Sequence, residues 1–114
     1  AENVFNNVPS YLGLAQTSQS ITADASSQVS DVTSAITEIN ATSATGAISL
    51  ADGTDGQIKI FINTSTSGTN NVVITPTNLR GGTTITLNAE GETAICLFKN
   101  SKWNVIGGHG FAVA

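Results

Sequence analysis

Hydrophobic and polar residues alternate through much of the chain at the spacing of β-strands. In QIKIFIN (57–63), Ile58, Ile60 and Ile62 lie on one face, and Lys59 and Phe61 lie on the other. A period of two is the pattern of a strand with two unlike faces. The same pattern predicts strands in SAITEIN (34–40), GAISL (46–50), NVVITPT (71–77), TTITL (83–87), TAICLF (93–98) and KWNVI (102–106).

The segments between these strands are rich in the residues that turns require. Gly, Asn and Asp recur in ADGTDG (51–56), NLRGG (78–82), NAEG (88–91) and KNSK (99–102). Short strands at regular spacing predict an all-β fold, a compact sandwich or barrel-like module of antiparallel strands over residues 34–114. We assign its core or subunit contacts to Ile58, Ile60, Ile62, Ile85, Leu87, Ile95, Leu97, Trp103 and Val105.

Residues 1–33 show neither strand nor helix periodicity over any long stretch. Their few apolar residues are followed by a run of Ser, Thr, Ala and Gln, which cannot bury enough surface to offset the entropy of ordering. We therefore predict an extended N-terminal arm, with a short helix near residues 23–31 as the alternative. The apolar side chains that we expect to contact a partner are Val4, Phe5, Val8, Tyr11, Leu12 and Leu14.

Two segments of the predicted module resemble each other. Residues 47–63 align without a gap on residues 84–100, with Ile48 on Ile85, Leu50 on Leu87 and Phe61 on Phe98. The glycines of the two segments do not align, so duplication and convergence both remain open. Under either origin we expect two strand–turn–strand units with equivalent inward positions.

Composition narrows the class of function. Charged residues make up 11% of the chain, against about 25% in typical soluble domains, whereas Ser and Thr supply 28 of the 114 residues. Four scattered cations do not form the basic stripe that binding to nucleic acid requires. The chain also has no apolar run of the roughly 20 residues that span a bilayer. We expect neither a nucleic acid nor a membrane as partner.

The single Cys and the single His are the obvious candidates for chemistry. Cys96 sits in an apolar strand between Ala94 and Phe98, where a thiol packs as a small hydrophobe. His109 lies in GGHG without further ligands at metal spacing, and Asp52 and Asp55 do not follow a calcium-loop pattern. We predict no catalytic residue, no metal and no cofactor, and regard a Cys/His hydrolase as the weakest alternative.

Trp103 is the strongest structural marker in the sequence. It alternates with Val105 after a polar turn, so we expect it in the core or at a subunit contact, with its indole N–H bonded to an acceptor. Stacking on a sugar is the alternative for this residue.

Residues 34–110 resemble small all-β structural proteins of tailed bacteriophages. The resemblance is carried by the strands Gly56 to Ile62, Val73 to Pro76, Gly82 to Leu87, Gly91 to Leu97 and Trp103 to Gly107. The pattern often has a glycine shortly before the tryptophan, whereas this chain has NSKW, which alters the turn.

The resemblance implies a non-enzymatic virion component, most like a capsid decoration (cement) protein. Such a protein sits on the outer capsid surface, commonly as a homotrimer, with N-terminal arms that contact the major capsid protein. The alternative within the same resemblance is a module of a head or tail fibre that binds host-surface glycans.

Overall fold

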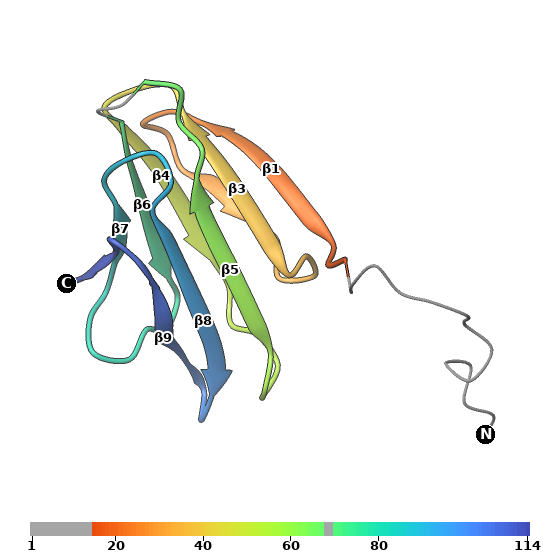
Figure 1. Cartoon of the computed structure of the whole chain (residues 1–114). Coiled ribbons are helices and arrows are strands. Elements are labelled where there is room, and N and C mark those ends of the chain that lie inside the picture. The colour runs from red at the N-terminus through yellow and green to blue at the C-terminus, as the bar shows by residue number, and fades with distance from the viewer. Residues whose placement is uncertain (1–14, 68–69) are drawn as a thin grey trace, which may run out of the picture.

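Two five-stranded β-sheets face each other in the computed structural model, which describes residues 15–67 and 70–114 (Figure 1). Sheet A has the order β1-β3-β5-β8-β9, and sheet B has the order β10-β7-β6-β4-β2. The described residues contain no helix, which confirms the all-β prediction, and hence none suited to crossing a bilayer. The strands are β1 (Ser18–Ala23), β2 (Gln28–Ser30), β3 (Ile36–Ala41), β4 (Thr45–Leu50), β5 (Ile58–Asn63), β6 (Asn71–Pro76), β7 (Ile85–Leu87), β8 (Thr93–Lys99), β9 (Lys102–His109) and β10 (Ala112–Val113).

The first six strands wind between the sheets like the coils of a solenoid. β1, β3 and β5 are parallel neighbours in sheet A, and β2, β4 and β6 are parallel neighbours in sheet B. The remaining strands add antiparallel pairs, β5 with β8, β8 with β9, β6 with β7 and β7 with β10. The sheets are therefore mixed, and the prediction of antiparallel strands throughout is wrong for the coils. A short connection here turns a corner from one sheet to the other, so successive strands do not form hairpins.

Much of the predicted arm belongs to this module. β1 pairs with β3 from Ser18 opposite Ile36 to Ala23 opposite Ala41, and β2 pairs with β4. An arm that extends to residue 33 is therefore too long, and the alternative helix near residues 23–31 is wrong. These strands gain their order from long-range ladders, which a local apolar pattern does not reveal. Val4, Phe5, Val8, Tyr11, Leu12 and Leu14 lie outside the described residues.

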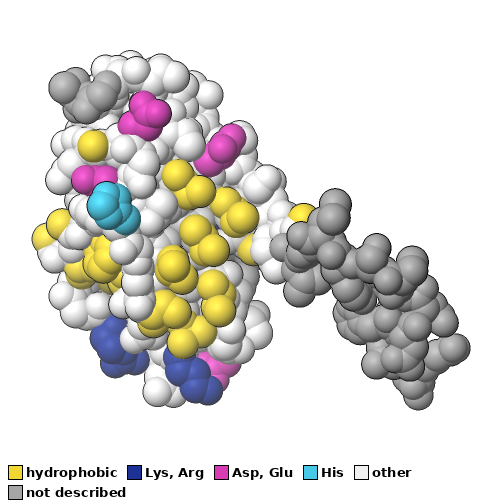
Figure 2. Space-filling view, viewed as in Figure 1, with side chains coloured by type: hydrophobic (Ala, Val, Ile, Leu, Met, Phe, Trp, Pro, Cys, Tyr) yellow, Lys and Arg dark blue, Asp and Glu magenta, His cyan; other side chains and the backbone are white. Residues whose placement is uncertain are grey.

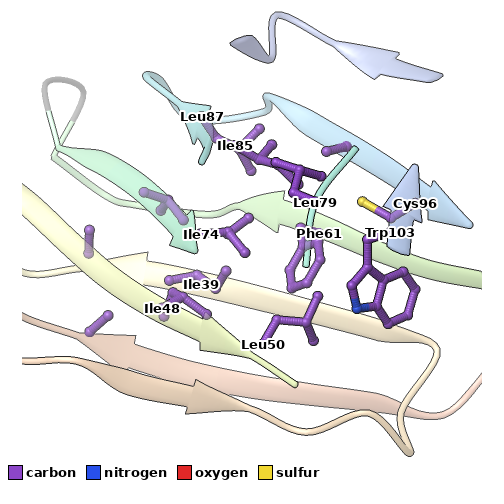
Figure 3. Packing of buried hydrophobic residues seen from close by; sticks show 14 of the residues in the cluster. Ile39, Ile48, Leu50, Phe61, Ile74, Leu79, Ile85, Leu87, Cys96 and Trp103 are labelled. Atoms are coloured by element: carbon purple, nitrogen blue, oxygen red, sulfur yellow. The ribbon is translucent and has the colours of Figure 1, made fainter. Parts of the chain in front are cut away.

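Apolar side chains from the inner faces of both sheets form one core (Figure 3). Residues of the same type stack across neighbouring strands. For example, Ile48 of β4 lies opposite Ile74 of β6, which in turn lies opposite Ile85 of β7. Such cross-strand stacks are the unit of sheet stabilisation. The largest apolar side chains that are fully buried in the core are Ile39, Ile48, Leu50, Phe61, Val72, Ile74, Ile85, Leu87 and Trp103.

The face of β5 that enters this core is not the isoleucine face. Lys59, Phe61 and Asn63 are buried, whereas Ile58, Ile60 and Ile62 point outward. The core assignment of these three isoleucines is therefore wrong, and their alternative role in a subunit contact stays a prediction. Alternation shows that a strand has two faces, but it does not show which of them is buried.

β8 has the same orientation as β5. Ala94, Cys96 and Phe98 are buried, and Ile95 and Leu97 are half-buried on the outer side, so the core assignment is wrong for these two as well. The remaining core predictions are confirmed: Ile85, Leu87 and Trp103 are buried, and Val105 packs against the core.

The two similar segments occupy equivalent places, as expected. Each begins with a strand in sheet B (β4 or β7) and ends with a strand in sheet A (β5 or β8). Phe61 and Phe98 both face inward, and Ile58 and Ile95 both face outward. The likeness is therefore one of architecture, whatever its origin.

Buried polar groups hold the coils together where Lys59 meets the loop between β2 and β3. The Lys59 side chain is fully buried, and its Nζ donates to the Ser34 carbonyl oxygen at 2.7 Å and to Asp31 Oδ1 at 3.3 Å. Its ammonium also lies 5.7 Å from the centroid of the Phe61 ring. The partners satisfy a charge that would otherwise be costly to bury.

Replacing Lys59 with methionine tests how this charge is held. Desolvation lowers the pKa of Lys59, so between its folded pKa and the unfolded value of about 10.4 the unfolded chain binds more protons. The parent protein should therefore gain stability relative to Lys59→Met as the pH rises through the folded pKa toward about 10.4. Urea unfolding at each pH measures this difference. Lys102→Met, at an exposed position, is the control, and an equal drift in both variants would contradict the prediction.

Urea unfolding of the same variants at acid pH tests the contribution of Asp31 to stability. Desolvation opposes ionisation of Asp31, but hydrogen bonds from Ser34 and Lys59 outweigh it and lower the pKa of the carboxyl group. Its stabilising contribution is present above the unfolded pKa of about 3.9 and is lost as the pH falls through the folded pKa. Lys59→Met removes one of the hydrogen bonds that lower the pKa of Asp31. The loss of folding stability in acid should therefore be smaller in that variant.

The β8–β9 hairpin closes through a turn in which both central residues have positive φ. Asn100 has a φ of 53° and Ser101 a φ of 64°, the geometry of a type I′ turn, which favours glycine at the second position. Ser101 stands where the phage-like pattern often has glycine. The structure therefore keeps the hairpin but places a residue with a side chain in a left-handed conformation.

Ser101→Gly should raise the free energy of unfolding by about 0.5–1 kcal/mol, because glycine removes the strain but adds entropy to the unfolded chain. Chemical denaturation measures the change. Ser101→Ala keeps the strain, so it should not stabilise the protein, and equal effects of the two substitutions would refute the explanation.

Candidate functional site

The outward side of sheet A carries a continuous set of aliphatic side chains on β3, β5 and β8 (Figure 2). Ile58 is 50% exposed, and the other members are half-buried by one another. Exposed apolar surface of this kind marks contact sites between macromolecules. We call this set the outer apolar face; it consists of Ile36, Ile58, Ile60, Ile62, Ile95 and Leu97.

Strand register brings these side chains together across the sheet. Ile60 lies opposite Ile36 of β3 on one side and opposite Ile95 of β8 on the other, which makes a row across three strands. Ile58 and Leu97 form a second row beside it. The sequence pattern predicts a core or contact role for all of these residues except Ile36, which stands alone among polar residues on its face of the predicted strand.

Charged side chains lie at the ends of the face (Figure 2). At one end, exposed Glu38 of β3 lies in register opposite Ile62. The charged residue within β5, Lys59, points inward. At the end of β8, Lys99 lies opposite Lys102 of β9. The Nζ of Lys99 is 2.8 Å from Asp55 Oδ2. Glu90 and Glu92 precede the other end of β8. An apolar centre with a polar rim is the anatomy of a protein–protein interface.

Asp55 is held at this rim by two donors. Lys99 Nζ and the Asn100 backbone N–H both bond to its carboxylate and hold its pKa below the usual range. Asp52 accepts from the Asn78 amide at 2.8 and 3.1 Å. Both carboxylates therefore act as turn residues, as expected.

Two neighbouring hollows lie in the described surface. One is lined by Gln16, Ala35, Gly56, Ile58 and Ile60, and so continues the outer apolar face toward the start of β1. Its neighbour is lined by Val32, Thr33, Thr54, Asp55, Gly56 and Gln57. The second lining contains two threonines and Asp55, but the Asp55 carboxylate accepts from Lys99 and Asn100 and is not bonded to either hydroxyl group. The threonines therefore lack the adjacent base that activates a nucleophile.

Cys96 and His109 do not form a catalytic pair. Cys96 is fully buried, and desolvation raises the pKa of its thiol to about 12. A nucleophilic thiolate requires the opposite, a lowered pKa at an accessible site. His109 is exposed at the end of β9, where its backbone N–H donates to Thr93 Oγ1 at 3.1 Å.

Trp103 is a core residue, as predicted. It is fully buried, its indole N–H donates to the Ala51 carbonyl oxygen at 2.9 Å, and its ring meets Phe98 edge-on with centroids 5.2 Å apart. A buried indole cannot stack on a sugar in this conformation, so the alternative role of Trp103 has no support.

The described part of the chain contains no cluster of side chains that could bind a metal ion. Among residues 15–67 and 70–114, no group of three His, Cys, Asp or Glu side chains is placed to hold an ion. The outer apolar face is thus the feature of the described surface that most clearly indicates contact with another molecule.

Comparison with known proteins identified no relative of the chain. No protein-family model matches the chain, and no curated protein matches its sequence.

Native Cys96 should resist alkylation by iodoacetamide at about pH 8, because about one thiol in 10⁴ with a pKa near 12 is ionised there. The same reagent should label the residue fully in denaturant. Mass spectrometry of the intact chain measures both states. Rapid labelling of the folded protein would contradict the burial of this thiol.

Proposed function

We propose that the protein is a non-enzymatic binding module of a virion, a capsid decoration (cement) protein that attaches to the outer surface formed by the major capsid protein. The observation that carries this proposal is the apolar composition of residues 1–14, which precede a two-sheet module whose described surface offers no catalytic constellation. The resemblance of residues 34–110 to structural proteins of tailed phages supports the same class.

Residues 1–14 are the proposed contact to the capsid. Besides Ala1 and Pro9, they carry six larger apolar side chains and a single charged one, Glu2, shortly before the module begins. A segment of this composition gains its favourable free energy by burying apolar side chains against another surface. The module that follows then remains on the outside of the shell.

Binding of this kind stabilises a shell by mass action. A protein that binds the assembled capsid, but not its dissociated subunits, lowers the free energy of the assembled state by an amount that grows with its concentration above Kd. Stabilising a shell in this way requires a folded binding module and no chemistry, and the two packed sheets provide such a module. A fibre module that binds glycans has less support, because Trp103 is buried.

Full-length protein should co-sediment with undecorated heads built from the major capsid protein of the same genome, and should raise their melting temperature. Phe5→Ser combined with Leu12→Ser should weaken binding by about a hundredfold, because each substitution removes a buried apolar contact worth roughly 1.5 kcal/mol. Calorimetry and sedimentation measure the two effects.

Val113→Ser, a partly exposed position in β10, is the matched control and should bind like the parent. Heads that neither sediment with the protein nor gain thermal stability would refute the decoration function. Binding to host glycans in an array, without binding to heads, would favour the fibre alternative.

A further inference from the structure

We propose that the outer apolar face is covered by a second copy of this chain, packed face to face about a two-fold axis that runs perpendicular to the strands. The partner is thus the same face of another molecule, and the strands of the two copies run antiparallel. This inference goes beyond the proposed attachment to capsids and does not depend on it.

The first argument is the composition of the face. Its rows, Ile36–Ile60–Ile95 and Ile58–Leu97, are aliphatic across three adjacent strands. Similar aliphatic positions on the inner faces are covered by the opposite sheet. The outer rows have no covering layer within residues 15–67 and 70–114, as the half-exposed Ile58 shows. A sheet with apolar residues on both sides is stable in water when both sides are covered.

The second argument is the arrangement of charge along β8 and β9. Lys99 and Lys102 are paired in register at one end of these strands, where an ion pair with Asp55 offsets the charge of Lys99. Glu38, which is exposed opposite Ile62, and Glu90 lie at the other end, whereas the Glu92 carboxylate accepts from the Asn88 backbone N–H. Turning one copy by 180° about an axis perpendicular to the strands places the basic end of one copy over the acidic end of the other. Lys102 would then face the Glu90 end of its partner, and the symmetry repeats this pairing on the other side.

Other arrangements of two faces lack this complementarity. A two-fold axis along the strands places the Lys99 and Lys102 ends of both copies together, and a three-fold axis along the strands gathers three of them. Like charges in contact disfavour both arrangements. The resemblance to phage proteins implies three copies, whereas the distribution of charge favours a closed pair.

An isologous pair is also self-limiting. Each copy uses the same surface, so the contact closes after two molecules and does not propagate into fibres. Gln16, which follows residues 1–14 closely in the sequence, lines the hollow that continues the face. Residues 1–14 are therefore the competing occupant that the experiment must distinguish.

Light scattering coupled to size exclusion should show full-length protein as a dimer without any capsid present. Ile60→Lys places a charge at the centre of the face and should weaken the dimer at least a hundredfold, to a monomer at micromolar concentration. Val29→Lys is the matched control, because Val29 is 68% exposed but lies on β2 in sheet B. It should remain a dimer, and circular dichroism should show both variants folded.

A charge exchange tests the orientation without a change in the apolar centre. Lys102→Glu should weaken the dimer by about tenfold, and adding Glu90→Lys to it should restore the parent value. Rescue by the second substitution supports antiparallel strands, because a parallel arrangement does not bring these residues together.

Three results would overturn the proposal. They are a monomeric parent protein, which would assign the face to residues 1–14 or another partner; a stable trimer; and a dimer unaffected by Ile60→Lys. Because no capsid is present, these outcomes are independent of the co-sedimentation test. A dimer that does not bind heads would refute the decoration function alone.

Discussion

The structure depends on which side of β5 enters the core, and the buried Lys59 ammonium marks that choice. Strand residues alternate between faces, so turning β5 over would exchange Lys59, Phe61 and Asn63 for the three isoleucines. The native orientation is tolerated because the loop between β2 and β3 offers the Ser34 carbonyl and Asp31 to the ammonium group. Asn63 is satisfied in the same way, by the backbone oxygens of Leu87 and Asn70.

This orientation has a direct consequence for the outside of the molecule. With polar groups held inside, the isoleucines of β5 face outward and join Ile36, Ile95 and Leu97 across the register of sheet A. The chain thus places apolar residues where a typical soluble sheet would place polar ones. Such an exchange is stable when another surface covers the isoleucines, and for this reason the function is sought in contacts rather than in chemistry.

The coiled arrangement explains how so few charges and so many hydroxyl groups can build a stable module. Each coil adds a strand to both sheets, and polar side chains near the core bond to the neighbouring coil. Gln19 accepts from the Asp31 amide and the Thr37 hydroxyl, and the Ser30 and Thr37 hydroxyls lie 3.1 Å apart. Every buried side-chain nitrogen or oxygen in the described residues has a partner. Stability is thus distributed between adjacent coils, as in other solenoids.

The sequence by itself determined the all-β class, the location of seven strands and the structural role of Trp103, because alternation and turn residues are local signals. It also indicated that Cys96 is a packing residue, since its neighbours on the strand face are apolar. Only the tertiary structure decided the parallel direction of the coils, the inclusion of β1 and β2, and the outward orientation of Ile58, Ile60 and Ile62. These features depend on ladders and hydrogen bonds between residues far apart in the chain, which no local pattern records. The outer apolar face belongs to this second group, because it exists only where the register of three strands brings its members together.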